Sequence, residues 1–82
     1  MKIMHYGIKK VEVVLQQRGQ KAARTPVETL PEASAVVTAW QDARGLGASG
    51  CGRQHGDVYI DGVLTHRVSY NGRIWPVEKV SL

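Results

Sequence analysis

Two dipeptides in the C-terminal part of the chain, Asp61-Gly62 and Asn71-Gly72, separate short runs rich in Val, Ile, Tyr, Thr and Trp. Each dipeptide can supply the two positive φ angles that a two-residue type I′ hairpin turn requires. β-branched and aromatic residues fit the pleated surface of a sheet. The stretch DVYIDGVLTHRVSYNGRIW therefore predicts a meander of three antiparallel strands.

Two-residue turns would also fix the register of this meander. Tyr59 would then oppose Leu64, and Val68 would oppose Trp75. Opposing residues lie on one face of a sheet, and alternate residues of a strand do so as well. These four residues would thus form the bulkier apolar face, which we expect to be the core. Pro76 restricts the last strand to an edge or a bulge.

The segment before the meander carries the start and stop signals of a helix. Thr29 and Glu32 have the spacing of a capping box. Arg44 followed by Gly45 is typical of a helix that ends in a Schellman turn. We predict a helix from about Leu30 to Arg44. Its apolar positions recur at three- and four-residue spacing and are Leu30, Ala33, Val36, Val37 and Trp40.

The N-terminal third predicts one strand and allows a second. KKVEVVLQQ alternates as a half-buried strand does, with Val11, Val13 and Leu15 on one side. Residues 22–28 form either a short edge strand, restricted by Pro26, or an extended connection. The predicted fold is one small α+β domain, residues 1–82, with an antiparallel sheet of four to five strands (β-(β)-α-β-β-β) and one helix on one face. Its expected core is Val11, Val13, Leu15, Leu30, Ala33, Val37, Trp40, Tyr59, Leu64, Val68 and Trp75.

A glycine-rich stretch, GLGASGCGRQHG, connects the predicted helix to the meander and holds the only cysteine, Cys51. A phosphate-binding loop lies between a strand and a helix and uses a Lys, whereas this stretch follows a helix and contains no Lys. Cys51 and His55 lie four residues apart on a glycine-rich loop, which would hold neither a nucleophile nor its base in place. We therefore expect no catalytic residue, and Gly45 is assigned to ending the helix.

Metal and acid–base sites receive weak support from the pattern. Cys51, His55 and His66, with Asp57 as a fourth ligand, lack the paired spacing of zinc sites on firm elements. The predicted register places Asp57 opposite His66, which we interpret as a structural cross-strand pair. No metal and no cofactor are expected.

Composition limits the cellular setting and the class of partner. The 82 residues include eleven Lys and Arg against seven Asp and Glu, for a net charge of +4. This excess permits attraction to nucleic acid or to an acidic protein, and it also suits a merely soluble surface. The N-terminus lacks the apolar block of a signal peptide, and no apolar run reaches the length of a membrane span. We expect a soluble cytoplasmic protein with no membrane contact and no small-molecule substrate.

The leading functional hypothesis is a non-catalytic module that acts through protein–protein contacts, either with a partner protein or as a homodimer. The meander face opposite the bulky one mixes apolar residues, such as Val58 and Ile74, with polar ones, which suits a partner surface. The glycine-rich loop and the sheet supply the candidate partner-binding residues, which are Arg53, His55, Arg67 and Arg73.

The alternative hypothesis is a weak, sequence-independent nucleic-acid-binding protein. Positive charge gathers around the first strand and its turn, at Lys9, Lys10, Arg18, Lys21 and Arg24, and Arg67 and Arg73 add to it. Sheet aromatics can stack on single-stranded bases. Here the aromatic residues of the meander are instead expected beneath the helix, as part of the core.

A general resemblance bears on the biological context. VYIDGVLTHRVSYNGRIW resembles the C-terminal hairpins of small proteins of bacteria and their mobile elements, and the element order looks like that of several small inhibitors and accessory proteins of phages and plasmids. The resemblance implies an accessory role in such a system. It concerns element order and transfers no functional residue.

Overall fold

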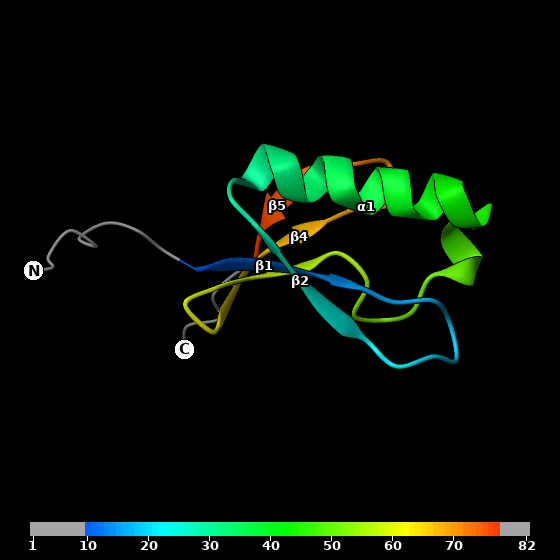
Figure 1. Ribbon diagram of the computed structural model, residues 1–82, viewed down its shortest axis with the longest axis horizontal. Coiled ribbons are helices and arrows are strands. Elements are labelled where there is room, and N and C mark those ends of the chain that lie inside the picture. Colours follow the sequence, from blue (N-terminus) through cyan, green and yellow to red (C-terminus); the bar gives the residue numbers. More distant parts are fainter. Residues whose placement is uncertain (1–9, 78–82) are drawn as a thin grey trace, which may run out of the picture.

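The computed structural model describes residues 10–77, which form an α+β fold with a five-stranded antiparallel sheet and one helix along one of its faces (Figure 1). The predicted fold class is therefore confirmed. The elements in chain order are β1 (Val11–Leu15), β2 (Ala23–Val27), α1 (Leu30–Arg44), a 3₁₀ turn (Ala48–Gly50), β3 (Asp57–Ile60), β4 (Val63–Val68) and β5 (Ile74–Pro76).

The strands lie in the order β2-β1-β3-β4-β5. The segment of residues 22–28, for which a strand or an extended connection was expected, therefore contains a strand, β2, at one edge of the sheet. Val11 pairs with Val27 of β2 on one side and with Ile60 of β3 on the other. An edge position suits β2, because Pro26 cannot donate a ladder hydrogen bond. Both prolines within strands, Pro26 and Pro76, lie on edge strands.

Helix α1 begins and ends where its capping residues predict. The Thr29 hydroxyl accepts the Glu32 backbone N–H at 3.1 Å, and the Glu32 carboxylate reaches back to the Glu28 N–H at 2.9 Å. At the other end Gly45 takes a left-handed conformation (φ 64°), and the Leu46 N–H donates to the Gln41 carbonyl, as in a Schellman turn. Among residues 10–77 no helix has the length and apolarity needed to cross a membrane.

The first hairpin turn is confirmed and the second differs from its prediction. Asp61 (φ 54°) and Gly62 (φ 84°) both have positive φ, as a type I′ turn requires. In the second turn, Gly72 alone has positive φ (88°), and the Ser69 N–H donates to the Arg73 carbonyl. The loop therefore contains three residues between Ser69 and Arg73, and this extra residue shifts the register of β5.

A β-bulge changes the first hairpin as well. Tyr59 opposes Leu64 as predicted, but the next residue of β3, Val58, opposes His66, which leaves Thr65 as an extra residue in β4. Asp57 consequently opposes Arg67, so the expected Asp57–His66 pair is wrong. A bulge moves the following residues of its strand to the other face of the sheet.

The two register changes place α1 on the face that was not expected to be the core. Val58 and Val68 are buried beneath the helix, whereas Trp75 opposes Arg67 and is 53% exposed. The predicted core positions of Tyr59, Leu64 and Trp75 are therefore wrong. The observed core is Val11, Val13, Leu15, Val27, Ala33, Val37, Val58 and Val68, with Leu30, Val36, Trp40, Ile60 and Ile74 partly buried against it.

Candidate functional sites

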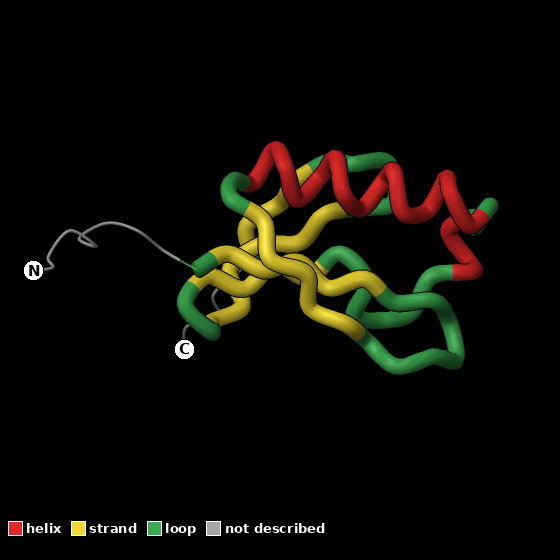
Figure 2. The backbone as a smooth tube through the Cα atoms, viewed as in Figure 1, coloured by secondary structure: helices red, strands yellow, loops and turns green. Residues whose placement is uncertain are grey.

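The face of the sheet opposite α1, here called the open face, carries no helix of residues 10–77 (Figures 1 and 2), and its side chains range from the exposed Trp75 to the buried Val14 and Asp57. Alternation along the strands assigns its residues, since Val13 and Val58 pair on the helix side and their neighbours point the other way. The open face consists of Glu12, Val14, Arg24, Pro26, Asp57, Tyr59, Leu64, Arg67 and Trp75.

An ion pair holds one cation of the open face in position. Arg67 Nε donates a hydrogen bond of 2.8 Å to Asp57 Oδ1. The Asp57 side chain is 6% exposed and the Arg67 side chain 57%, so the carboxylate lies below the guanidinium. This hydrogen bond and the charge of Asp57 raise the pKa of Arg67. Arg67 thus stays charged, and the residue directly across from it in β5 is the exposed Trp75.

A second cation of the open face is held in the same manner. Arg24 Nη1 lies 3.5 Å from Glu12 Oε1, and its guanidinium carbon lies 3.8 Å from the centre of the Tyr59 ring. The Glu12 side chain is again the more buried partner, at 16% exposed against 47% for Arg24. The open face therefore exposes Arg24, Arg67 and Trp75, whereas both carboxylates and the Tyr59 ring lie beneath the arginines.

The glycine-rich loop is bound to the end of β1 and lies beside the β1–β2 turn (Figure 2). The Gly52 N–H donates to the Gln16 carbonyl and the Arg18 N–H to the Gly50 carbonyl, which continues the pairing of β1 beyond its end. A Cβ atom at Gly52 would overlap the Gln16 side chain. These backbone bonds make the loop part of the sheet rather than a free connection.

His55 joins the loop to both β1 and α1. Its Nδ1 accepts the Gln16 backbone N–H at 2.9 Å, so the ring proton lies on Nε2 and is donated to Gln41 Oε1, also at 2.9 Å. Gln41 is buried and donates in turn to the Tyr70 carbonyl. The ring of Trp40 lies 5.1 Å away. Burial lowers the pKa of His55, which keeps the ring neutral.

Cys51 has no basic partner among the described residues. Its thiol lies 3.6 Å from the Gly47 carbonyl, and burial raises its pKa, which is the opposite of what a nucleophilic thiol needs. Both ring nitrogens of His55 are engaged elsewhere. His66 Nδ1 contacts the Thr65 hydroxyl at 2.9 Å. Within residues 10–77 no three His, Cys, Asp or Glu side chains gather as a metal site would require.

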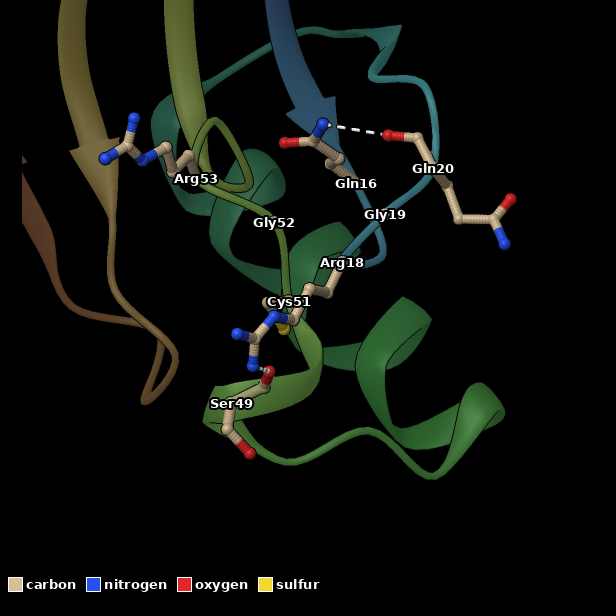
Figure 3. Close-up of a pocket in the computed structure, with 8 residues that line it drawn as sticks. All are labelled: Gln16, Arg18, Gly19, Gln20, Ser49, Cys51, Gly52 and Arg53. Atoms are coloured by element: carbon tan, nitrogen blue, oxygen red, sulfur yellow. Dashed lines mark hydrogen bonds between the residues drawn. The ribbon is translucent and has the colours of Figure 1, made fainter.

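Two hollows flank the β1–β2 turn. The first, of about 600 Å³, lies between that turn and the glycine-rich loop, and Arg18 and Arg53 are the charged residues that line it (Figure 3). The second, of about 300 Å³, lies toward the end of α1 and is lined by Lys21 and Arg44 among others. Gln20 lines both hollows, so they meet at the turn.

The four predicted partner-binding residues do not form one site. Arg67 lies on the open face, and Arg53 lines the first hollow. His55 is half-buried between the loop and the helix, and Arg73 is exposed in the turn before β5. The loop and the sheet therefore offer separate surfaces.

The predicted nucleic-acid residues are also divided. Arg18 and Lys21 line the two hollows, while Lys10 and Arg24 both contact Glu12. Lys9 lies outside the described residues. The sequence interpretation missed Trp75 on the open face and Arg44 at the second hollow. The only sequence feature that could have indicated the position of Arg44 is its place in the last turn of the predicted helix, next to the glycine-rich loop.

Comparison with known proteins gives no match, whether with protein-family models, with curated proteins or with solved structures. The function is therefore inferred from the described residues themselves.

Proposed function

We propose that this protein is a small non-catalytic binding module that acts through protein–protein contacts, and that its partner binds the open face. The observation that carries the proposal is the 53% exposure of Trp75 directly across from Arg67. Trp and Arg are the residue types that most often dominate the energy of protein interfaces. An exposed tryptophan directly across from an exposed arginine therefore favours a role in binding.

The geometry of the open face also favours one kind of partner. Its arginines are exposed, whereas Asp57 and Glu12 lie beneath them. A complementary surface would bring carboxylates to Arg24 and Arg67 and an apolar group to Trp75. A second copy of the chain, with the same net charge of +4, is disfavoured by repulsion. We therefore infer an acidic protein segment with apolar side chains, and self-association is the competing outcome.

Selection from a display library of random peptides tests this proposal without knowledge of the natural partner. The immobilised wild-type protein is expected to enrich peptides that combine Asp or Glu with aromatic or aliphatic residues. Trp75→Ala should weaken the selected peptides by about 30-fold in Kd, which corresponds to about 2 kcal/mol for an interface hot spot. Isothermal titration calorimetry measures the difference.

The matched control is Val63→Ser, because Val63 is 61% exposed but pairs with Ile60 on the helix side of the sheet. It should leave peptide affinity unchanged. Equal losses of peptide affinity in Trp75→Ala and Val63→Ser would contradict a partner site on the open face. An affinity that neither substitution changes would contradict it as well. Dimerisation that Trp75→Ala abolishes, measured by sedimentation equilibrium, would assign the face to a second copy.

We also propose a cytoplasmic location and an accessory role of the kind seen in phage and plasmid systems. The free, half-buried thiol of Cys51 is compatible with a reducing compartment. The order of elements supports the accessory role by resemblance only.

Nucleic-acid binding is the second candidate function, and one specific observation favours it. Four cations line the two hollows at the β1–β2 turn, away from the ion pairs of the open face.

A further inference from the structure

One end of the molecule concentrates positive charge from the β1–β2 turn, the last turn of α1 and the glycine-rich loop that follows α1. Arg18 and Lys21 come from the β1–β2 turn, Arg53 from the glycine-rich loop and Arg44 from the last turn of α1. The backbone bonds between the loop and β1 bring these segments together. We call these four residues and the two hollows that they line the basic end.

The charge of the basic end is not neutralised within residues 10–77. The ion pairs there involve Lys10, Arg24 and Arg67, and none of the four cations of the basic end. In the described part of the chain, no carboxylate lines either hollow. This arrangement contrasts with the open face, where both arginines have a carboxylate beneath them.

Part of the basic end is held in place before any ligand binds. Arg18 Nη1 donates to the Ser49 carbonyl at 3.2 Å, which leaves its other N–H groups available. The Arg44 guanidinium lies 4.6 Å from the centre of the Trp40 ring. The Gln16 side-chain amide donates to the Gln20 carbonyl (Figure 3) and accepts the Gln54 N–H, which fixes one wall of the first hollow. Ordered donors reduce the entropy lost on binding.

We propose that the basic end binds the phosphodiester backbone of a single-stranded nucleic acid, at a surface separate from the open face. The cations lie on both sides of the turn, and Arg18 and Arg53 point in different directions (Figure 3), so they cannot all meet one small anion. An extended chain with a phosphate at every step can contact them in succession.

The character of the first hollow separates this ligand from an acidic peptide. Its lining, among residues 10–77, is polar and cationic, with Gln16, Gln20 and Ser49 beside the arginines and no large apolar side chain. A peptide would gain little in the first hollow beyond charge, whereas the open face offers Trp75, Tyr59 and Leu64; the apolar residues Leu15 and Trp40 of the basic end line only the second hollow. A flexible single strand can also bend around the turn, which a duplex does only at the cost of deformation.

Fluorescence anisotropy of a labelled, mixed-sequence DNA strand of about 20 nucleotides tests the proposal. Four phosphate contacts with a single strand predict that affinity falls about 50-fold between about 50 and about 200 mM NaCl. Lys21→Ala/Arg53→Ala removes one cation from each hollow, and neither side chain makes a hydrogen bond within residues 10–77. Binding should weaken, and the loss over the same salt range should shrink to about 7-fold.

The matched control is Lys10→Ala/Arg73→Ala, which removes the same charge from exposed positions that line neither hollow. It should retain nearly the wild-type affinity and salt dependence. Thermal unfolding by circular dichroism verifies that both double variants fold. Equal losses in both would show a diffuse charge effect and overturn the site.

Two competitors complete the test. Poly-glutamate with the same number of charges should displace the DNA poorly, and tripolyphosphate should do so only at a much higher phosphate concentration. Equal displacement by poly-glutamate would overturn the phosphodiester assignment, and equal displacement by tripolyphosphate would assign the site to a small polyphosphate. Absence of binding at about 50 mM NaCl would overturn the proposal altogether. None of these outcomes depends on the open face, so the proposed protein-binding function is tested independently.

Discussion

The backbone N–H of Gln16 donates a hydrogen bond of 2.9 Å to Nδ1 of His55, and this contact ties the glycine-rich loop to the end of β1. Because Nδ1 accepts, the ring proton must lie on Nε2, which donates a hydrogen bond to Gln41 Oε1. The neutral form of His55 is therefore the only one that satisfies both partners. If Nδ1 were protonated, its N–H would face the Gln16 N–H, and two donors would meet without an acceptor.

Folding stability should consequently fall in mild acid. The pKa of His55 is lowered by burial, so the unfolded chain binds a proton at higher pH than the folded chain does. The stabilisation is present above the ordinary histidine pKa of about 6.5 and is lost as the pH falls through the lowered value. Urea unfolding between about pH 8 and about pH 5 measures it. His55→Gln should flatten the profile, and a profile unchanged by His55→Gln would contradict the role of His55.

Gln41 should matter more than its place on the helix suggests. Gln41→Leu leaves the His55 Nε2–H and the Tyr70 carbonyl without their partner, which costs about 1 to 3 kcal/mol when such groups are buried. The neighbouring exposed change, Asp42→Leu, should stay within about 0.5 kcal/mol of wild type. Chemical denaturation compares the two, and similar effects would argue against the hydrogen-bond chain.

Gly56 should tolerate no side chain. It has φ of 90° and donates to the Val14 carbonyl, and a Cβ atom there would overlap the Val68 carbonyl oxygen. Gly56→Ala should destabilise the protein by at least about 2 kcal/mol. Gly47 has an ordinary φ of −88°, and no atom lies within 4 Å of the place a Cβ would take, so Gly47→Ala should be neutral or slightly stabilising. Thermal unfolding that ranks the two variants in the opposite order would refute this account of the loop.

The assignment of the two sheet faces can be tested by stability alone. Val58→Ala opens a cavity beneath α1 and should cost about 2 kcal/mol, although it removes fewer atoms than Trp75→Ala. Trp75→Ala should cost less than Val58→Ala, because Trp75 is 53% exposed and its removal opens no cavity beneath α1. If urea midpoints showed Trp75→Ala to be more destabilising than Val58→Ala, the aromatic face would be the core and this assignment of the faces would be wrong.

The parts of the fold that local chemistry decides could be predicted from the sequence. Thr29 and Gly45 mark the bounds of α1, and Asp61-Gly62 forms the expected turn. The faces of the meander could not be predicted, because they depend on the count of residues between turns. The bulge at Thr65 and the three-residue loop before Arg73 each shift that count by one. A shift of one residue reverses every side chain beyond it.

The same difference between local features and features that depend on the strand register holds for the candidate sites. The predicted nucleic-acid residues Arg18 and Lys21 line the hollows at the turn in which the sequence places them, and Arg53, predicted as a partner-binding residue, joins them because the loop is bonded to the end of β1. The predicted Asp57–His66 pair does not form, because it needed the register to be right. The role of Gln41 had no signal in sequence, since its partners lie in the loop and in the turn after β4.

The central claim, that a protein partner binds the open face, is tested most directly by following the two tryptophan indole N–H signals in an NMR titration with a peptide selected on the wild-type protein. Trp75 lies on the open face, whereas Trp40 packs against the core on the helix side. Trp75→Ala assigns the two signals. The Trp75 indole should shift progressively to saturation while the Trp40 indole stays in place. Saturable binding that moves Trp40 and leaves Trp75 unchanged would contradict the claim.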